Sequence, residues 1–275
     1  NYKAHSLKSA VLRHLGRDNE ARNIADKALE KDPLNPWAGF ELYLAKKKIA
    51  GETAEKEYKQ LNKVLQANKT QSYLDMATNY IKCGLWNDGY QLLSKYIGSE
   101  NPGDPLIYYY MGYISERVDE SNSSKQYYEE GAAASPDYCF PFRIETLKIL
   151  NQVLDVQPDD DRAHYYLGNL LYHFKQEEKA IAAWDKSQAL NDEFAYVHSN
   201  LGMANRRVRG NLDKAIRYYE KAVDKGENPR FITELARIYK IADVSFQKRL
   251  QLLEGNKDLT SERDDALSHL VETYT

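Results

Sequence analysis

Cationic, aromatic and amide side chains recur at steps of three and four residues in three stretches that begin near residues 161, 195 and 229. Such steps keep side chains on one stripe of a helix. Arginine binds carboxylates through two hydrogen bonds and stacks on aromatic rings, and asparagine hydrogen-bonds a peptide main chain. This chemistry fits the recognition of an extended or acidic peptide. The stripe residues are Arg162, Tyr165, Asn169, Tyr172, Tyr196, Asn200, Met203, Arg206, Arg207, Arg230, Arg237 and Lys240.

The charge of this stripe differs from that of the whole chain. It holds six cations and no acid, with Glu234 at its margin, whereas the chain has 38 basic and 41 acidic residues and a formal net charge of −3. The overall balance does not favour nucleic-acid binding. The segregated cations favour an anionic partner, and an ordinary solvated face is the alternative.

The sequence lacks the motifs of common catalytic, metal and cofactor sites. It has no phosphate-binding glycine loop, no HExxH pair and no GxSxG elbow. His164 and His173 would point to opposite sides of one helix, and Cys83 and Cys139 lie in separate units. We therefore predict no catalytic residue, no metal ligand and no cofactor. An enzyme stays an alternative that a deep pocket with pKa-perturbed acids would support.

The helices that position the stripe recur with a nearly constant period. Small residues on successive units are separated by 34 or 35 residues in six of seven intervals. Two antiparallel helices of about 14 residues with two short turns need about this length. Within a pair, Gly168 is expected to face Ala180, and Gly202 to face Ala215. The helix pairs are predicted to begin near residues 1, 35, 70, 105, 160, 195, 229 and 261.

This pattern resembles the tetratricopeptide repeat, in which Leu-Gly or Leu-Ala at positions 7–8 is followed by alanines at 20 and 27 and a proline near 32. The resemblance implies an all-α fold, a right-handed superhelical α-solenoid of about eight helix pairs. It also implies that first helices line a concave groove for protein or peptide partners, and that the chain is a scaffold without enzymatic activity.

One interval breaks the period. From Gly112 to Gly168 the chain runs 56 residues, and the extra stretch contains Phe140-Pro141-Phe142 and a helix-like run from Ile144 to Val156. We interpret this run as a lone second helix whose first-helix partner is replaced by an irregular segment. The segment could be a spacer or a binding surface. The predicted domains are an N-terminal array at 1–137, the irregular segment with its helix at 138–159, and a C-terminal array at 160–275 with a truncated last unit.

A known peptide site of the family clasps a C-terminal carboxylate with two lysines, two asparagines and an arginine. Asn169, Asn200 and Arg230 match three of these positions, while Tyr165 and Glu234 replace a lysine and the arginine. These departures argue against a clamp for chaperone tails. The resemblance still allows the asparagine pair to hold the main chain of an extended peptide.

The stretch from Tyr166 to Tyr239, followed by Arg263-Asp264-Asp265, is more distantly similar to a group of bacterial proteins. In these proteins a mutarotase-like, β-rich domain of unknown function precedes a tetratricopeptide array. This similarity implies a larger parent protein, whose upstream domain could itself be the partner. A carbohydrate-associated accessory module is therefore the alternative function, with Tyr165, Tyr172 and Tyr196 as sugar-stacking rings; Trp184 is expected in the core.

Location is not assigned by the sequence. The first residue is not methionine and the last residues continue a helical pattern, so we expect a piece of a longer protein from which a signal peptide could have been removed. No apolar stretch reaches the roughly 18 residues of a membrane span. A cytoplasmic location is favoured over other compartments.

Overall fold

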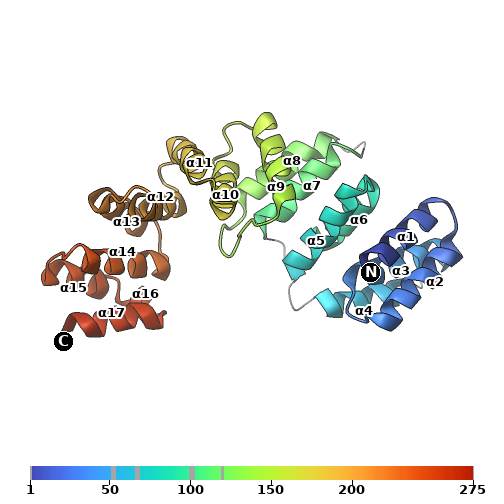
Figure 1. Ribbon diagram of the computed structural model, residues 1–275, viewed down its shortest axis with the longest axis horizontal. Coiled ribbons are helices and arrows are strands. Elements are labelled where there is room, and N and C mark those ends of the chain that lie inside the picture. Colours follow the sequence, from blue (N-terminus) through green and yellow to red (C-terminus); the bar gives the residue numbers. More distant parts are fainter. Residues whose placement is uncertain (1, 51–53, 66–68, 99–102, 119–120, 275) are drawn as a thin grey trace. The chain divides into compact units, whose positions relative to one another are not determined.

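The computed structural model describes residues 2–50, 54–65, 69–98, 103–118 and 121–274, and within these ranges it contains seventeen helices and no strand (Figure 1). The fold is therefore all-α, as predicted. The helices are α1 (Tyr2–His14), α2 (Asp18–Lys31), α3 (Pro36–Ala50), α4 (Glu55–Leu65), α5 (Lys69–Lys82), α6 (Trp86–Ile97), α7 (Pro105–Ser115), α8 (Ser121–Ala133), α9 (Ile144–Val156), α10 (Asp161–His173), α11 (Glu177–Leu190), α12 (Ala195–Arg207), α13 (Leu212–Lys225), α14 (Pro229–Ile241), α15 (Phe246–Gly255), α16 (Lys257–Ser261) and α17 (Asp264–Tyr274).

The first helices of the pairs begin where the period predicts. Seven of them, α1, α3, α5, α7, α10, α12 and α14, begin within one residue of the expected position. Side-chain caps fix several starts: Asp160 accepts from the Ala163 amide at 2.8 Å, and Asn228 accepts from the Arg230 amide at 3.0 Å. These caps satisfy amides that have no partner within the helix.

The last predicted start is displaced from residue 261 to Asp264. A short helix that the period does not predict, α16, lies between α15 and α17 and ends at Ser261. Its Thr260 hydroxyl is buried and donates to the Leu253 carbonyl at 3.0 Å, which holds α16 against the end of α15.

The chain forms two compact units, Asn1–Tyr127 and Tyr128–Thr275. The N-terminal unit contains α1 to α7, and the C-terminal unit contains α9 to α17, with α8 at the junction. The sequence-based domain boundaries at residues 137 and 159 stay predictions. Among the described residues, no helix combines the length and the hydropathy needed to cross a membrane.

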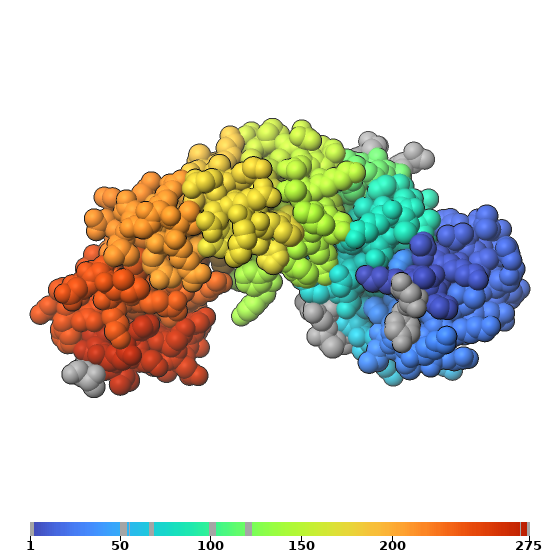
Figure 2. All heavy atoms as spheres, in the orientation of Figure 1, coloured from blue at the N-terminus to red at the C-terminus, as the bar shows by residue number. Residues whose placement is uncertain are grey.

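Helix α9 packs against α10 in the way that α11 packs against α12 and α13 packs against α14. Each of these contacts joins a second helix to the first helix of the next pair. The segment before α9, residues 134–143, has no helix. In Figure 2 this yellow-green segment stands out as a knob from the helices of its unit. The structure therefore matches the interpretation of α9 as a lone second helix.

The helices of one pair approach closely where the first helix carries glycine. A Cβ atom on Gly168 would lie 2.4 Å from the indole ring of Trp184 and 3.0 Å from the Ala180 carbonyl oxygen. A Cβ atom on Gly202 would lie 3.0 Å from the ring of Tyr219. Ala180 thus faces Gly168 as predicted, but the nearest atoms at both glycines belong to an aromatic ring one turn beyond each alanine, which the sequence did not predict.

This packing yields a stability prediction. Gly168→Ala should lower the free energy of unfolding by about 1–3 kcal/mol, because the new methyl group overpacks the indole of Trp184. Gly255→Ala is the matched control: Gly255 ends α15 with open space around its Cα, so stability should stay constant or rise by about 0.4–1 kcal/mol. Urea unfolding measures both changes. Equal stability of the two variants would show that the α10–α11 contact is not tight.

Candidate functional site

The stripe residues all lie in the C-terminal unit, on α10, α12 and α14. Their exposure differs more than a helical stripe alone would predict. Arg207, Arg230 and Lys240 are exposed, Tyr165 is buried, and the half-buried members are Arg162, Asn169, Tyr172, Tyr196, Asn200, Met203, Arg206 and Arg237.

Two stripe asparagines form an amide cluster with the core tryptophan. The Asn169 side-chain oxygen accepts from Asn200 Nδ2 at 2.6 Å and from Trp184 Nε1 at 3.0 Å. These two bonds use both lone pairs of that oxygen. Trp184 is 1% exposed, which confirms that it lies in the core. The amide that was expected to hold a partner's main chain is thus already bonded from within the protein.

Tyr165 is buried next to the two asparagines of the amide cluster. Burial raises the pKa of its phenol to about 12, although hydrogen bonds from Asn169 and Asn200 lower it. Its ring meets that of Phe194 edge-on, with centroids 4.9 Å apart. The Cys139 thiol of the irregular segment lies close enough to contribute to the raised pKa.

Three of the six stripe cations have an acid at ion-pair distance. Arg237 lies 3.4 Å from Glu234, and the Lys240 ammonium lies 2.8 Å from Glu272 of α17. Arg162 lies 3.7 Å from the neighbouring Asp161 carboxylate, and its guanidinium stacks on an aromatic ring, that of Phe194. The charges of these three cations are partly compensated within the protein, so they attract an anionic partner less strongly than the sequence predicts.

The other three cations, Arg206, Arg207 and Arg230, make no ion pair within the described part of the chain. Arg206 and Arg207, at the end of α12, are near Tyr219 of α13. Burial raises the pKa of Tyr219 to about 12, and the charges of these arginines lower it. Arg230 is exposed in the first turn of α14.

The irregular segment reaches the same face, a contact that the sequence did not predict. The Tyr196 hydroxyl donates to the Asp137 carboxylate, and Asn228 Nδ2 donates to the Tyr196 oxygen at 3.1 Å. Tyr196 and Asp137 are 59 residues apart in the chain. An acid therefore lies on a face from which the sequence excluded acids.

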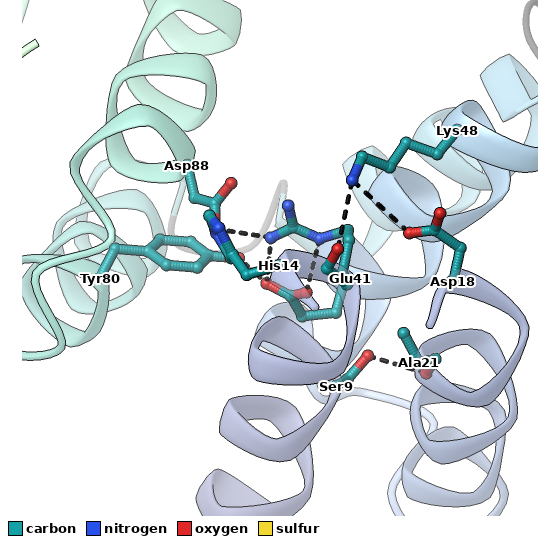
Figure 3. A network of polar contacts seen from close by, with 9 residues as sticks. Ser9, His14, Asp18, Ala21, Glu41, Lys48, Tyr80 and Asp88 are labelled. Carbon is teal, nitrogen blue, oxygen red and sulfur yellow. Dashed lines mark hydrogen bonds and ion pairs between the residues drawn. The ribbon is translucent and has the colours of Figure 1, made fainter. Parts of the chain in front are cut away.

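A second polar site, which the sequence analysis missed, lies in the N-terminal unit (Figure 3). Arg13 of α1 binds Glu41 of α3 through Nε at 3.2 Å and Nη2 at 3.4 Å, and it binds Asp88 of α6 at 2.6 Å. The side chains of all three are at most 6% exposed. The Tyr80 hydroxyl donates to Glu41 at 2.5 Å, and the His14 ring lies 2.8 Å from Asp88. One guanidinium thus joins two carboxylates from different helices.

Burial controls the ionisation of this network. It raises the pKa of Glu41, against the opposing effect of Arg13, and it raises the pKa of Tyr80 well above its usual value. A hollow of about 550 Å³ between α2, α3 and α4 has a lining that includes Lys46 and Glu57 but no member of the network. We interpret the network as a structural tie. Its signal in the sequence is Glu41, a lone acid within an apolar run.

Within the described ranges, no cluster of three or more histidine, cysteine, aspartate or glutamate side chains could hold a metal ion. Cys83 is exposed and Cys139 is buried, and they belong to different units.

Comparison with known proteins finds a match to a repeat family in one part of the chain. Residues 147–193, which include most of α9 and all of α10 and α11, match the family model of the tetratricopeptide repeat. The solved structure of MamA is similar, with 19% identity, coverage of 79% of this chain and 93% of that one, and a TM-score of 0.31. TTC0263, a TPR protein of Thermus thermophilus, has 17% identity, coverage of 86% and 98%, and a TM-score of 0.35. YrrB, described as a TPR protein with an unusual peptide-binding site, has 13% identity, coverage of 75% and 94%, and a TM-score of 0.32.

The buried network predicts a large mutational effect. Glu41→Ala should lower the free energy of unfolding by about 3–5 kcal/mol, because it removes one partner of a buried ion pair. Glu20→Ala is the control, since Glu20 pairs with Arg17 on the surface and should contribute little. Denaturant titration compares the two variants. A small loss for Glu41→Ala would contradict the structural tie.

The raised tyrosine pKa values predict alkaline destabilisation. Burial raises the pKa of Tyr165, Tyr196, Tyr219 and Tyr239 to about 12, from an ordinary value of about 10. Because folding favours the protonated phenols, their contribution to stability is complete below pH of about 10 and is lost as the pH rises towards 12. Unfolding free energies across this range should fall, and Tyr165→Phe should reduce the fall. A flat profile would exclude buried phenols at these positions.

Proposed function

We propose that the chain is a non-enzymatic interaction scaffold of tetratricopeptide repeats whose α10, α12 and α14 face binds an acidic, extended segment of a partner protein. The partner could be a separate protein or an upstream domain of the same polypeptide. The single observation that supports this most strongly is the set Arg206, Arg207 and Arg230, which have no ion pair within the described residues.

The chemistry of these arginines suits carboxylates. A guanidinium presents two parallel N–H donors to one carboxylate, which gives short charge-assisted hydrogen bonds. Arg206 and Arg207 end α12, and Arg230 begins α14, so the cations come from two successive first helices. A partner in extended conformation could meet donors from both helices.

The amide cluster and the aromatic rings would shape this face rather than bind the ligand directly. Asn169 and Asn200 are bonded to each other, and Tyr165 lies below them. Met203 packs against a core cluster that includes Tyr219 and Leu235. These contacts make the face rigid, and a rigid face loses less conformational entropy when a ligand binds.

The carbohydrate-associated alternative has no structural observation in its favour. A sugar-stacking ring needs an open face, but Tyr165 is buried, Tyr172 packs on Trp184 with centroids 5.6 Å apart, and Tyr196 packs on Phe231 at 5.2 Å. We therefore retain the peptide-binding scaffold as the proposed function.

Charge reversal on the stripe tests the proposal. The variant Arg206→Glu, Arg207→Glu, Arg230→Glu should lose binding of a fluorescent Glu-rich peptide, measured by anisotropy. Wild-type binding should weaken as salt is added, because salt screens exposed charges. A Gln-rich peptide of the same length should bind neither protein.

The matched control reverses three cations on second helices, with Lys179→Glu, Lys186→Glu and Arg217→Glu on α11 and α13. These residues are exposed, and the change in net charge is the same. The control should bind the Glu-rich peptide nearly as well as wild type. Equal losses in both triple variants would mean that net charge alone attracts the peptide and that the first-helix face is not the site.

A further inference from the structure

The irregular segment at 134–143 places an acid on the face that we propose for acidic partners. Both oxygens of the Asp137 carboxylate are bonded: one accepts from the Tyr196 hydroxyl, and the other accepts from the Ser135 hydroxyl at 3.0 Å. Pro136 and Pro141 lie on either side of the acid in the sequence. The segment thus presents the group expected of an external acidic ligand, a carboxylate, at a turn in which the Cys139 amide donates to the Pro136 carbonyl at 3.3 Å.

One of the two hydroxyls that bind Asp137, that of Tyr196, is held in place by the residue that caps α14. Asn228 caps this helix: its side-chain oxygen accepts from the Arg230 amide at 3.0 Å, and its Nδ2 donates to the Tyr196 oxygen at 3.1 Å. A phenol that accepts one hydrogen bond is polarised into a better donor for the next. The Tyr196 hydroxyl is therefore oriented towards a carboxylate by the cap of the neighbouring repeat.

The rest of the segment is anchored at one point and exposed at another. The Cys139 side chain is 2% exposed and lies near Tyr165 on α10. Tyr138 is 91% exposed and has φ of 59°, a left-handed conformation that is uncommon for a residue with a side chain. The segment therefore contacts α12 through Asp137 and lies near α10 at Cys139, and both helices carry stripe residues.

We propose that Tyr196 and Asn228 form a carboxylate subsite of the binding face, that Asp137 occupies it as a resident ligand, and that an aspartate or glutamate of an external acidic segment displaces Asp137 from it. This inference rests on the proposed function and assigns one of its contacts. Because Asp137 is tethered to the site, it competes at a high effective concentration. An external segment must therefore gain additional contacts, which Arg206, Arg207 and Arg230 would supply.

The occupied subsite lowers the apparent affinity for an external ligand. When only a fraction of the molecules has the subsite open, the measured dissociation constant rises in inverse proportion to that fraction. Removing the negative charge of Asp137 should thus strengthen the binding of an external acid, even though Asp137 is not itself one of the stripe residues. This is the opposite of what a structural role of Asp137 in the face would predict.

The thiol of Cys139 reports whether the segment is in place. In a Cys83→Ser background, which removes the exposed thiol, Asp137→Asn should increase the rate of Cys139 labelling by a maleimide several-fold. Tyr196→Phe should do the same while retaining the ring that packs on Phe231. Asp159→Asn, at an exposed acid before α10, is the matched control and should label like wild type.

The binding arm uses the Glu-rich peptide. The peptide should accelerate Cys139 labelling in the Cys83→Ser protein that retains Asp137. It should also bind Asp137→Asn several-fold more tightly than wild type. Adding Tyr196→Phe to Asp137→Asn should reverse much of this gain in affinity. Circular dichroism and urea unfolding would confirm that these variants are folded. A labelling rate that Asp137→Asn does not change would overturn the resident contact.

The two proposals fail in different ways. Peptide binding that requires Arg206, Arg207 and Arg230 but is unaffected by Asp137→Asn would overturn the subsite and leave the binding face intact. Absence of peptide binding in every variant, including Asp137→Asn, would overturn the proposed function and the displacement together.

Discussion

The close contact between Gly168 and the indole of Trp184 links the packing of the helices to the candidate binding face. Because Gly168 has no Cβ, the indole comes near enough to α10 for its N–H to reach Asn169 at 3.0 Å. Asn169 in turn accepts from Asn200 on the next first helix at 2.6 Å. One missing methyl group thus allows a second helix to fix an amide on the face of the first helices, and that amide joins two repeats.

Charge is compensated locally along this face, and the uncompensated positions define where a partner would bind. Arg237 and Lys240 pair with acids of their own or a neighbouring helix. Asp137, which belongs to the irregular segment and not to a repeat, binds Tyr196 on the same face. The cations at the end of α12 and the start of α14 have no such acid within the described residues. In the N-terminal unit, the Arg13 network shows the opposite arrangement, in which charges are buried, satisfied and used to join helices. Exposure therefore separates the structural charges from those available to a ligand.

The helix starts could be predicted from the sequence because the period follows from helix geometry. The sequence could not predict that Trp184 rather than Ala180 would be the main neighbour of Gly168, because the crossing of two helices depends on all side chains between them. The Asp137–Tyr196 contact could not be predicted from the sequence for another reason. It depends on the path of a segment without periodicity, and such a path leaves no regular pattern in the sequence. Glu41 did leave a signal, since an acid within an apolar run needs a buried partner.

The most direct test of the binding face is the indole ¹H–¹⁵N NMR spectrum during titration with the Glu-rich peptide. The chain has three tryptophans, and the Trp184 N–H is bonded to Asn169 on this face, whereas Trp37 and Trp86 belong to the N-terminal unit. The account predicts that the Trp184 signal shifts in proportion to bound peptide while those of Trp37 and Trp86 stay in place. A shift of Trp37 or Trp86 with Trp184 unchanged would contradict it.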